Sequence, residues 1–188
     1  MARVILVDGD KRPDLAQLVA KLSGARGGKL INVYRLLLNT PPIASAWVDF
    51  NSAVRKAFEL DQKTLEIVII RVAILNRTEY IFRAHVPGYA TKAGLTTVQV
   101  DDLFDWQTST AFDAKERATL AYTDEVTRNV QASDAVFSEA SVHYSEQQMV
   151  ELTVLIGAYN MHSRVMSALK SDFEPGWDLS AVQWKPAK

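Results

Sequence analysis

One segment restricts the fold of this chain more than any other. The run QKTLEIVIIRVAIL, from about Gln62 to Leu75, is apolar on nearly every side, and we predict that it forms a helix. A helix that is hydrophobic all round is buried on most of its faces. Glu66 and Arg71 interrupt the run, and a charge in such a helix costs several kcal/mol unless it is paired or hydrogen-bonded. Their spacing of five places them on different faces, so each should have its own partner or line a wet cavity.

The rest of the sequence favours an all-α fold. There is no Asn-Gly pair, and the single Asp-Gly is not followed by an alternating strand. Two capping boxes, Asp113 with Glu116 and Ser145 with Gln148, predict the starts of two later helices. The hydrophobic content of 48% is enough to fill a core without disulfides or metals. We therefore predict one all-helical domain over residues 1–188.

Composition excludes several classes of function. Lys plus Arg number 21 against 22 Asp plus Glu, and no basic cluster is interleaved with aromatic residues, so we expect no nucleic-acid partner. The apolar stretch near the N-terminus is too short for a signal sequence and no run is long enough to cross a membrane, which favours a cytoplasmic protein. With no cysteine, disulfides, thiolate metal sites and thiol chemistry are all excluded.

The histidines do not form a metal site. Of the three, His143 stands apart, and His162 follows Glu151 by eleven residues on a predicted helix. Eleven helical residues span about 16 Å, too far for one metal ion to be bound by both. We therefore expect no metal and no cofactor.

Directly after the apolar run, the stretch NRTEYIFRAH predicts the start of another helix. Asn76 can be its N-cap and Glu79, three residues on, can complete a capping box, which would place Thr78 in the first turn. A helix N-terminus favours bound anions and lowers the pKa of a thiol placed there. Pro87 must bend or restart this helix beside His85.

A family resemblance rests on these segments. Glu66, the apolar helix, Asn76, the TEY triplet, His85, Ala90 and the AGL triplet resemble the carboxymuconolactone decarboxylase and alkylhydroperoxidase D (AhpD) superfamily, over roughly residues 34–169. The resemblance implies an AhpD-like helical fold that assembles into trimers or hexamers. It also implies pockets at or near the subunit contacts.

The superfamily pattern is Glu, then Cys-x-x-Cys, then His. By position, Glu66 matches the glutamate, Thr78 and Ile81 the two cysteines, Tyr80 an intervening residue and His85 the histidine. Neither Thr nor Ile can become a sulfenic acid or a disulfide, so we expect no thiol peroxidase activity. The thiol-free branch resembles the lactone decarboxylases, whose reaction needs proton transfer and no redox centre.

The corresponding hypothesis is a lyase that performs acid/base chemistry on a small carboxylate or lactone-like substrate. His85 would donate or accept the proton, because the ordinary pKa of histidine lies nearest neutrality. Glu66 would orient it, and Tyr80 could donate a hydrogen bond to a developing enolate oxygen. The residues expected to bind the substrate are Arg71, Asn76 and Thr78.

Structural interpretations stand beside these roles. Glu66 could be a buried partner for an amide or an arginine, His85 a satisfied core histidine, and Tyr80 an aromatic anchor. Arg71 could be structural or part of an anion pocket. The rival to the enzyme is a non-catalytic oligomeric scaffold or binding protein, and the tail, residues 172–188, would pack on the domain or on a partner subunit.

Overall fold

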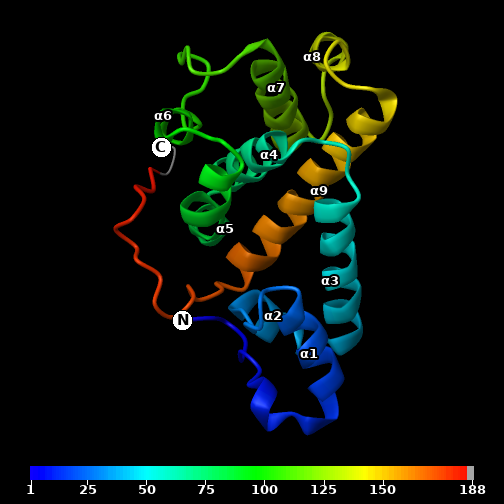
Figure 1. Cartoon of the computed structure of the whole chain (residues 1–188), viewed down its shortest axis with the longest axis vertical. Helices are drawn as coiled ribbons and strands as arrows, with labels where there is room; N and C mark the ends of the chain where they lie inside the picture. Colours follow the sequence, from blue (N-terminus) through cyan, green and yellow to red (C-terminus); the bar gives the residue numbers. More distant parts are fainter. Residues whose placement is uncertain (186–188) are drawn as a thin grey trace. The chain divides into compact units, whose positions relative to one another are not determined.

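The computed structural model describes residues 1–185, and helices make up its regular structure, with no strand in this range. The all-α prediction is confirmed. Short 3₁₀ turns precede the first helix, and a π-helical turn follows α5. The helices are α1 Ala16–Gly24, α2 Asn32–Leu37, α3 Pro41–Lys56, α4 Gln62–Leu75, α5 Glu79–His85, α6 Thr97–Asp102, α7 Ala114–Asn129, α8 Asp134–Ser141 and α9 Glu146–Ala168 (Figure 1).

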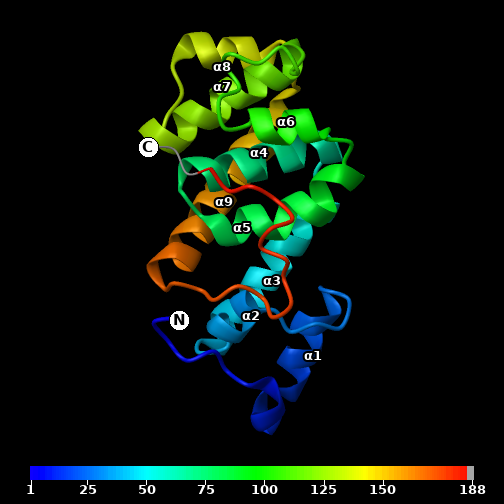
Figure 2. The same ribbon diagram turned by 90° about the vertical axis from the view of Figure 1, so that its left-hand side faces the viewer.

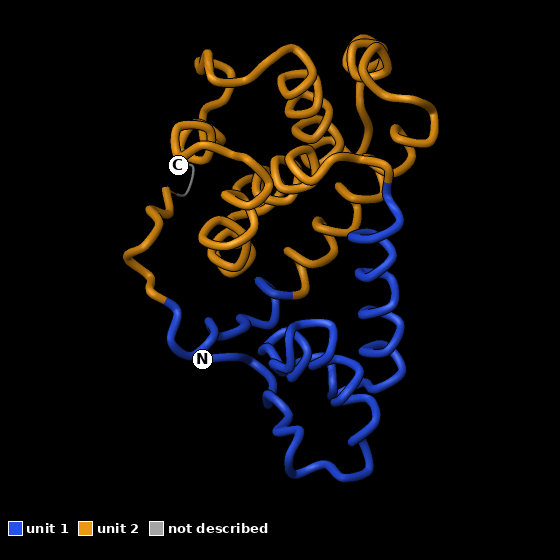
Figure 3. Tube along the Cα trace, viewed as in Figure 1, with its two compact units in different colours: residues 1–58, 166–177 blue, residues 59–165, 178–188 orange. Residues whose placement is uncertain are grey.

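The chain divides into two compact units (Figure 3). Unit 1 holds Met1–Phe58 and Met166–Trp177, and unit 2 holds Glu59–Val165 and the chain from Asp178 onward. All the residues that match the superfamily pattern lie in unit 2. The single domain over residues 1–188 stays a prediction.

In unit 1, helices α1 and α2 pack against α3. Pro41 begins α3 because its fixed φ suits the first turn of a helix, where a backbone N–H has no intrahelical partner. Asn32, at the start of α2, donates its backbone N–H to Glu174 at 2.8 Å and its side-chain amide to the carbonyls of Asp172 and Phe173. These bonds hold the segment after α9 on the first helices of the unit.

In unit 2, α4 is the central helix and packs against both α5 and α7 (Figure 2). Every residue from Thr64 to Ile74 is buried, and the helix begins and ends where the apolar run predicts. The Asp61 side chain caps its N-terminus by accepting the backbone N–H of Thr64 at 2.8 Å. The burial expected for this segment is therefore confirmed.

Both predicted capping boxes are also present. Glu116 N–H donates to the Asp113 carboxylate and Asp113 N–H to that of Glu116, at 2.8 and 3.0 Å. Ser145 and Gln148 exchange the equivalent bonds at the start of α9. Local side-chain chemistry thus sets the starts of α7 and α9.

The last described residues, 178–185, form a C-terminal strap that runs across α5 (Figure 2). Arg83 donates from Nη1 to the carbonyl of Leu179 at 2.6 Å. Trp184 packs its ring on Phe82 and Phe104, with centroids 5.0 and 5.9 Å apart. This part of the tail packs on the helices of its own chain, which is one of the two predicted alternatives. Among the described helices, none is long and apolar enough to cross a membrane.

Candidate functional site

The centre of the candidate site is a buried contact between α4 and α5. Nδ1 of His85 lies 2.6 Å from Oε2 of Glu66, and the side chains are 7% and 2% exposed. Glu66 comes from the middle of α4 and His85 from the last turn of α5, and the three-residue link between the helices folds them together. The structure therefore brings together two of the three residues predicted to be catalytic.

The contact determines which ring nitrogen could do chemistry. An ionised carboxylate only accepts hydrogen bonds, so Nδ1 of His85 is assigned as the donor to Glu66. In the neutral ring, Nε2 then carries the lone pair, and it is the atom through which a proton could be gained or lost. Glu66 holds the ring in one orientation and compensates the charge that the ring carries once protonated.

Two tyrosines that sequence reasoning did not assign to the site contact His85. The ring of Tyr89 lies 5.2 Å from the His85 ring, and that of Tyr159, on α9, lies 5.6 Å away edge-on. Tyr89 is 38% exposed, whereas Tyr159 is buried, so the side of His85 nearer solvent is the Tyr89 side. The spacing of four between His85 and Tyr89 was a signal for the first contact, because residues four apart share a helix face. The contact with Tyr159 joins helices far apart in sequence and had no local signal.

The capping role predicted for Asn76 is wrong. Asn76 closes α4 instead, and α5 begins at Glu79 with Thr78 as its N-cap residue and no side-chain capping bond. The amide of Asn76 donates to Val72 O at 3.1 Å and to Asn160 Oδ1 at 3.0 Å. The competing acceptors at the end of α4 and on α9 draw this side chain away from the start of α5.

Thr78 and Tyr80 lie on different sides of α5. Thr78 is buried and donates its hydroxyl to the carbonyl of Asn76 at 3.4 Å, so the hydroxyl is used on nearby backbone. It precedes His85 by seven residues, close to two helical turns, and shares its face. Tyr80, also buried, precedes His85 by five residues and therefore points about 140° away around the helix axis. A meeting of Tyr80 with the Glu66–His85 pair stays a prediction.

Arg71 is bound in a separate ion pair. Its Nε and Nη2 donate to the two oxygens of Asp124 on α7, each at 2.6 Å, and Nη1 donates to Leu103 O at 2.7 Å. Trp106 adds an indole N–H to the same carboxylate at 3.3 Å. These partners favour the structural interpretation of Arg71 over an anion pocket.

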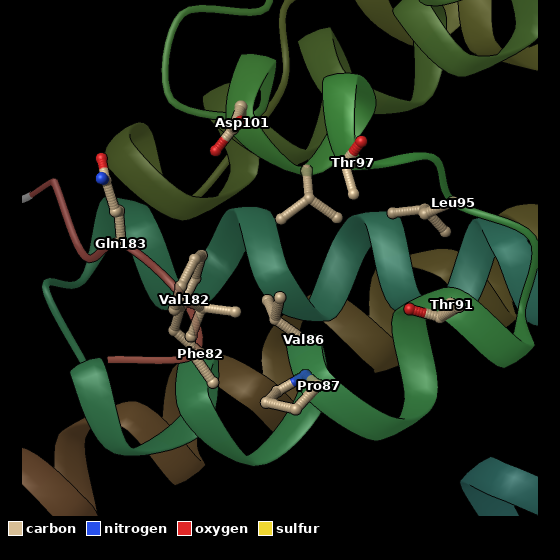
Figure 4. Close-up of a pocket in the computed structure, with 11 residues that line it drawn as sticks. Phe82, Val86, Pro87, Thr91, Leu95, Thr97, Asp101, Val182 and Gln183 are labelled. Carbon is tan, nitrogen blue, oxygen red and sulfur yellow. The ribbon is translucent and has the colours of Figure 1, made fainter. Parts of the chain in front are cut away.

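A cleft in unit 2 lies beside this site but does not contain the pair. It has a volume of about 470 Å³ and is lined by residues of α5, the π-helical turn, α6 and the strap (Figure 4). Phe82 and Val86 line it, while Glu66 and His85 do not. Among residues 1–185, no group of three His, Asp or Glu side chains could hold a metal ion.

Comparison with known proteins bears on this arrangement. Residues 41–125, which include the pair, match the model of the carboxymuconolactone decarboxylase family. The superfamily resemblance predicted from the sequence is confirmed over this segment. The chain is also 25% identical over 116 residues to the uncharacterized protein YdfG of Bacillus subtilis, a match that covers 61% of this chain and 78% of YdfG.

Solved structures support the AhpD-like fold. An uncharacterized peroxidase-related protein from Silicibacter sp. TM1040 superposes with a TM-score of 0.79 at 18% identity, over 94% of this chain and 93% of that one. A structure of the debrominase Bmp8 in complex with 2,3,4-tribromopyrrole superposes with a TM-score of 0.76 at 20% identity, over 93% and 95% of the two chains. At these identities the likeness establishes the fold alone.

Proposed function

We propose that this chain is a thiol-independent lyase that removes a carboxylate from, or moves a proton on, a small lactone-like or enol-forming carboxylic acid. The observation that carries the proposal is the 2.6 Å contact between His85 Nδ1 and Glu66 Oε2, inside the segment that matches the decarboxylase family. A buried histidine held by a carboxylate is an arrangement suited to general acid/base catalysis. The absence of cysteine leaves no thiol for the peroxidase chemistry of other members.

In the proposed reaction, the bond between the substrate carbon and its carboxylate breaks and carbon dioxide leaves. The electron pair stays on the substrate as an enolate. His85 enters this step protonated on both ring nitrogens, gives the Nε2 proton to the carbon and becomes neutral, and water then returns a proton to Nε2. Glu66 keeps the ring oriented throughout, and Tyr80 is proposed to donate a hydrogen bond to the enolate oxygen. Asn76 and Thr78, which lie in the link just before α5, are proposed to contact the bound substrate.

The decisive experiment measures carbon dioxide release from carboxymuconolactone and from acetoacetate, a simple β-keto acid. We expect turnover by the wild type and a loss of about a hundredfold or more for His85→Asn, the typical contribution of a general acid or base. His143→Asn, a half-buried histidine outside the site, is the matched control and should keep full activity. No turnover of either compound, or equal activity of the two variants, would contradict the proposal.

A second candidate, the non-catalytic oligomeric scaffold, is favoured by one observation. Glu66 and His85 are almost completely buried, and neither lines the described cleft. In a scaffold, the pair would only join α4 to α5. His85→Asn would then lower the free energy of unfolding, and the wild type would release no carbon dioxide.

We also propose that the chain forms a homo-oligomer, a trimer or hexamer as the superfamily resemblance implies. Three apolar residues of α9, Val150, Val154 and Met161, are 63%, 38% and 39% exposed. Their spacing of four and seven places them along one face of the helix, and an exposed apolar stripe of this kind is typical of an interface. Light scattering should give a mass of several chains, and Val154→Glu should lower it. A monomer at micromolar concentration would contradict this expectation.

A further inference from the structure

The cleft of unit 2 has the size of a small-molecule site. Its volume of about 470 Å³ falls in the range of about 300–1,000 Å³ that is usual for ligand pockets. Figure 4 shows α5 and the π-helical turn on one side and the start of α6 on the other, with strap residues closing one end. The lining residues are Phe82, Val86, Pro87, Thr91, Leu95, Thr97, Val100, Asp101, Ala181, Val182 and Gln183.

The chemistry of the lining favours an uncharged ligand that offers both carbon surface and hydrogen-bonding groups. Phe82, Val86 and Leu95 are buried and present carbon surface. Polar atoms, among them threonine hydroxyls and one amide, make up about as much of the lining as apolar atoms do. Asp101 is the one ionisable group among the described lining residues, and it repels anions. Its partner Lys185 is 4.0 Å away, and both side chains are more than half exposed, so this ion pair compensates the carboxylate only weakly.

One wall of the cleft is formed by the C-terminal strap. Ala181, Val182 and Gln183 line the cleft directly. Arg83 binds the carbonyl of Leu179, which precedes them, at 2.6 Å and the carbonyl of Val182 itself at 3.3 Å. Trp184, which follows them, is seated on the aromatic rings of α5 and of the segment after α6. The strap is thus fastened at both ends of the wall that it supplies.

We propose that this cleft is a binding site for an uncharged molecule of aromatic-ring size, and that the strap is part of the site. The site is separate from the Glu66–His85 pair, because neither residue lines it. It also selects against the carboxylates proposed as substrates, because Asp101 disfavours a negative ligand. The inference therefore does not depend on the catalytic proposal.

Two fluorescent probes with the same ring system test this site. N-phenyl-1-naphthylamine is uncharged, and 1-anilinonaphthalene-8-sulfonate adds one negative charge; both brighten when they leave water. We expect the uncharged probe to bind the wild type with one site per chain, and the anionic probe to bind at least about tenfold more weakly, a difference that corresponds to about 1.4 kcal/mol. Equal binding of the two probes would overturn the assigned ligand class.

Two substitutions on α6 locate the probe. Val100→Phe adds a ring inside the cleft and should weaken binding of the uncharged probe by about tenfold or more. Val98→Phe adds the same ring at a position that is 58% exposed and outside the lining, so it should leave binding unchanged. Circular dichroism confirms that both variants fold. Equal affinity of the two variants would overturn the site.

Trp184→Ala tests the strap. Loss of the ring that anchors the strap should weaken binding of the uncharged probe several-fold, in comparison with both the wild type and Val98→Phe. His85→Asn should not change probe binding, because His85 is outside the lining. Unchanged binding in Trp184→Ala would show that the strap is no part of the site, and a loss in His85→Asn would show that the probe occupies the catalytic pair instead.

Discussion

Helix α4 carries two buried acid–base pairs, one with an arginine and the other with a histidine. Arg71 and Asp124 share two contacts of 2.6 Å, and further donors and acceptors surround both groups. Glu66 lies five residues earlier on α4, and its carboxylate contacts His85 of α5 at 2.6 Å. The two pairs lie on the same helix at nearly the same burial.

The difference follows from the chemistry of the cations. An arginine keeps its charge at any ordinary pH, so a buried arginine must find a partner for each donor. A histidine can be neutral, so its pair can exchange a proton. Two equally buried pairs can therefore have different roles: the Arg71 pair joins α4 to α7, and the Glu66 pair is the one for which we propose proton chemistry.

The largest expected effect is at the arginine pair. Asp124→Ala leaves the Arg71 guanidinium buried without its carboxylate, and we expect the free energy of unfolding to fall by about 3–5 kcal/mol. Urea unfolding followed by circular dichroism measures the change. Asp101→Ala, which removes a carboxylate that is 60% exposed, is the control and should change stability by less than about 1 kcal/mol. Similar values for the two variants would mean that the buried Arg71 does not depend on Asp124 for its stability.

A smaller effect is expected at the histidine pair. Glu66→Gln keeps the size of the side chain and can still accept from His85, so we expect a loss of about 1–2 kcal/mol, as for a weakened buried hydrogen bond. A double-mutant cycle with His85→Asn isolates the coupling between the two side chains. If Glu66→Gln lowered the free energy of unfolding as much as Asp124→Ala does, His85 would need the charge of Glu66 as strongly as Arg71 needs that of Asp124.

The smallest effect concerns an exposed pair at the start of the same helix. Burial raises the pKa of Asp61, but hydrogen bonds from Lys115 and Thr64 outweigh it and leave the pKa below its ordinary value of 3.8. Because the folded pKa is the lower one, Asp61 stabilises the fold above about pH 4, and this contribution is lost as the pH falls below it. Asp61→Ala should cost about 1 kcal/mol at pH 7 through loss of the cap.

The cost of Asp61→Ala should shrink when urea unfolding is repeated near pH 3. Asp61→Asn is the matched control, because an amide oxygen can still cap the helix without a titrating charge. It should lower stability less than Asp61→Ala at pH 7. A cost of Asp61→Ala that is the same at both pH values would show that the carboxylate charge contributes nothing.

Much of the fold could be predicted because its signals are local. The bounds of α4 follow from an unbroken apolar run, and the starts of α7 and α9 follow from capping boxes that are complete within four residues. The contact of Glu66 with His85 was expected from the superfamily pattern together with the short link between their helices. The partner of Arg71 could not be foreseen, because Asp124 lies 53 residues away in the sequence.

The failure at Asn76 has a physical reason of the same kind. Asn, two intervening residues and Glu is a local signal for a helix start, but Asn is also a common residue at helix ends. Asn160, 84 residues away, supplies an acceptor that stabilises the second possibility. Arg77 then takes a left-handed conformation, with φ of 55°, and the new helix starts two residues later. Asn76 could start α5 or end α4, and its contact with Asn160, which exists only in the folded chain, favours the end of α4.

The π-helical turn at Val86–Ala90 has a consequence for how this segment can diverge. A π turn holds one residue more than an α turn, so the residues after it are out of phase with those before it by about 100°. Val86 at the start of the turn and Thr91 just after it, five residues apart, both line the cleft. In a regular α-helix five residues would separate their directions by about 140°, so the extra residue of the π turn is what lets both face the same space. A chain shortened by one residue within the turn would form a regular helix that keeps these two neighbours in phase, so this is where the segment can lose a residue at least cost to the cleft.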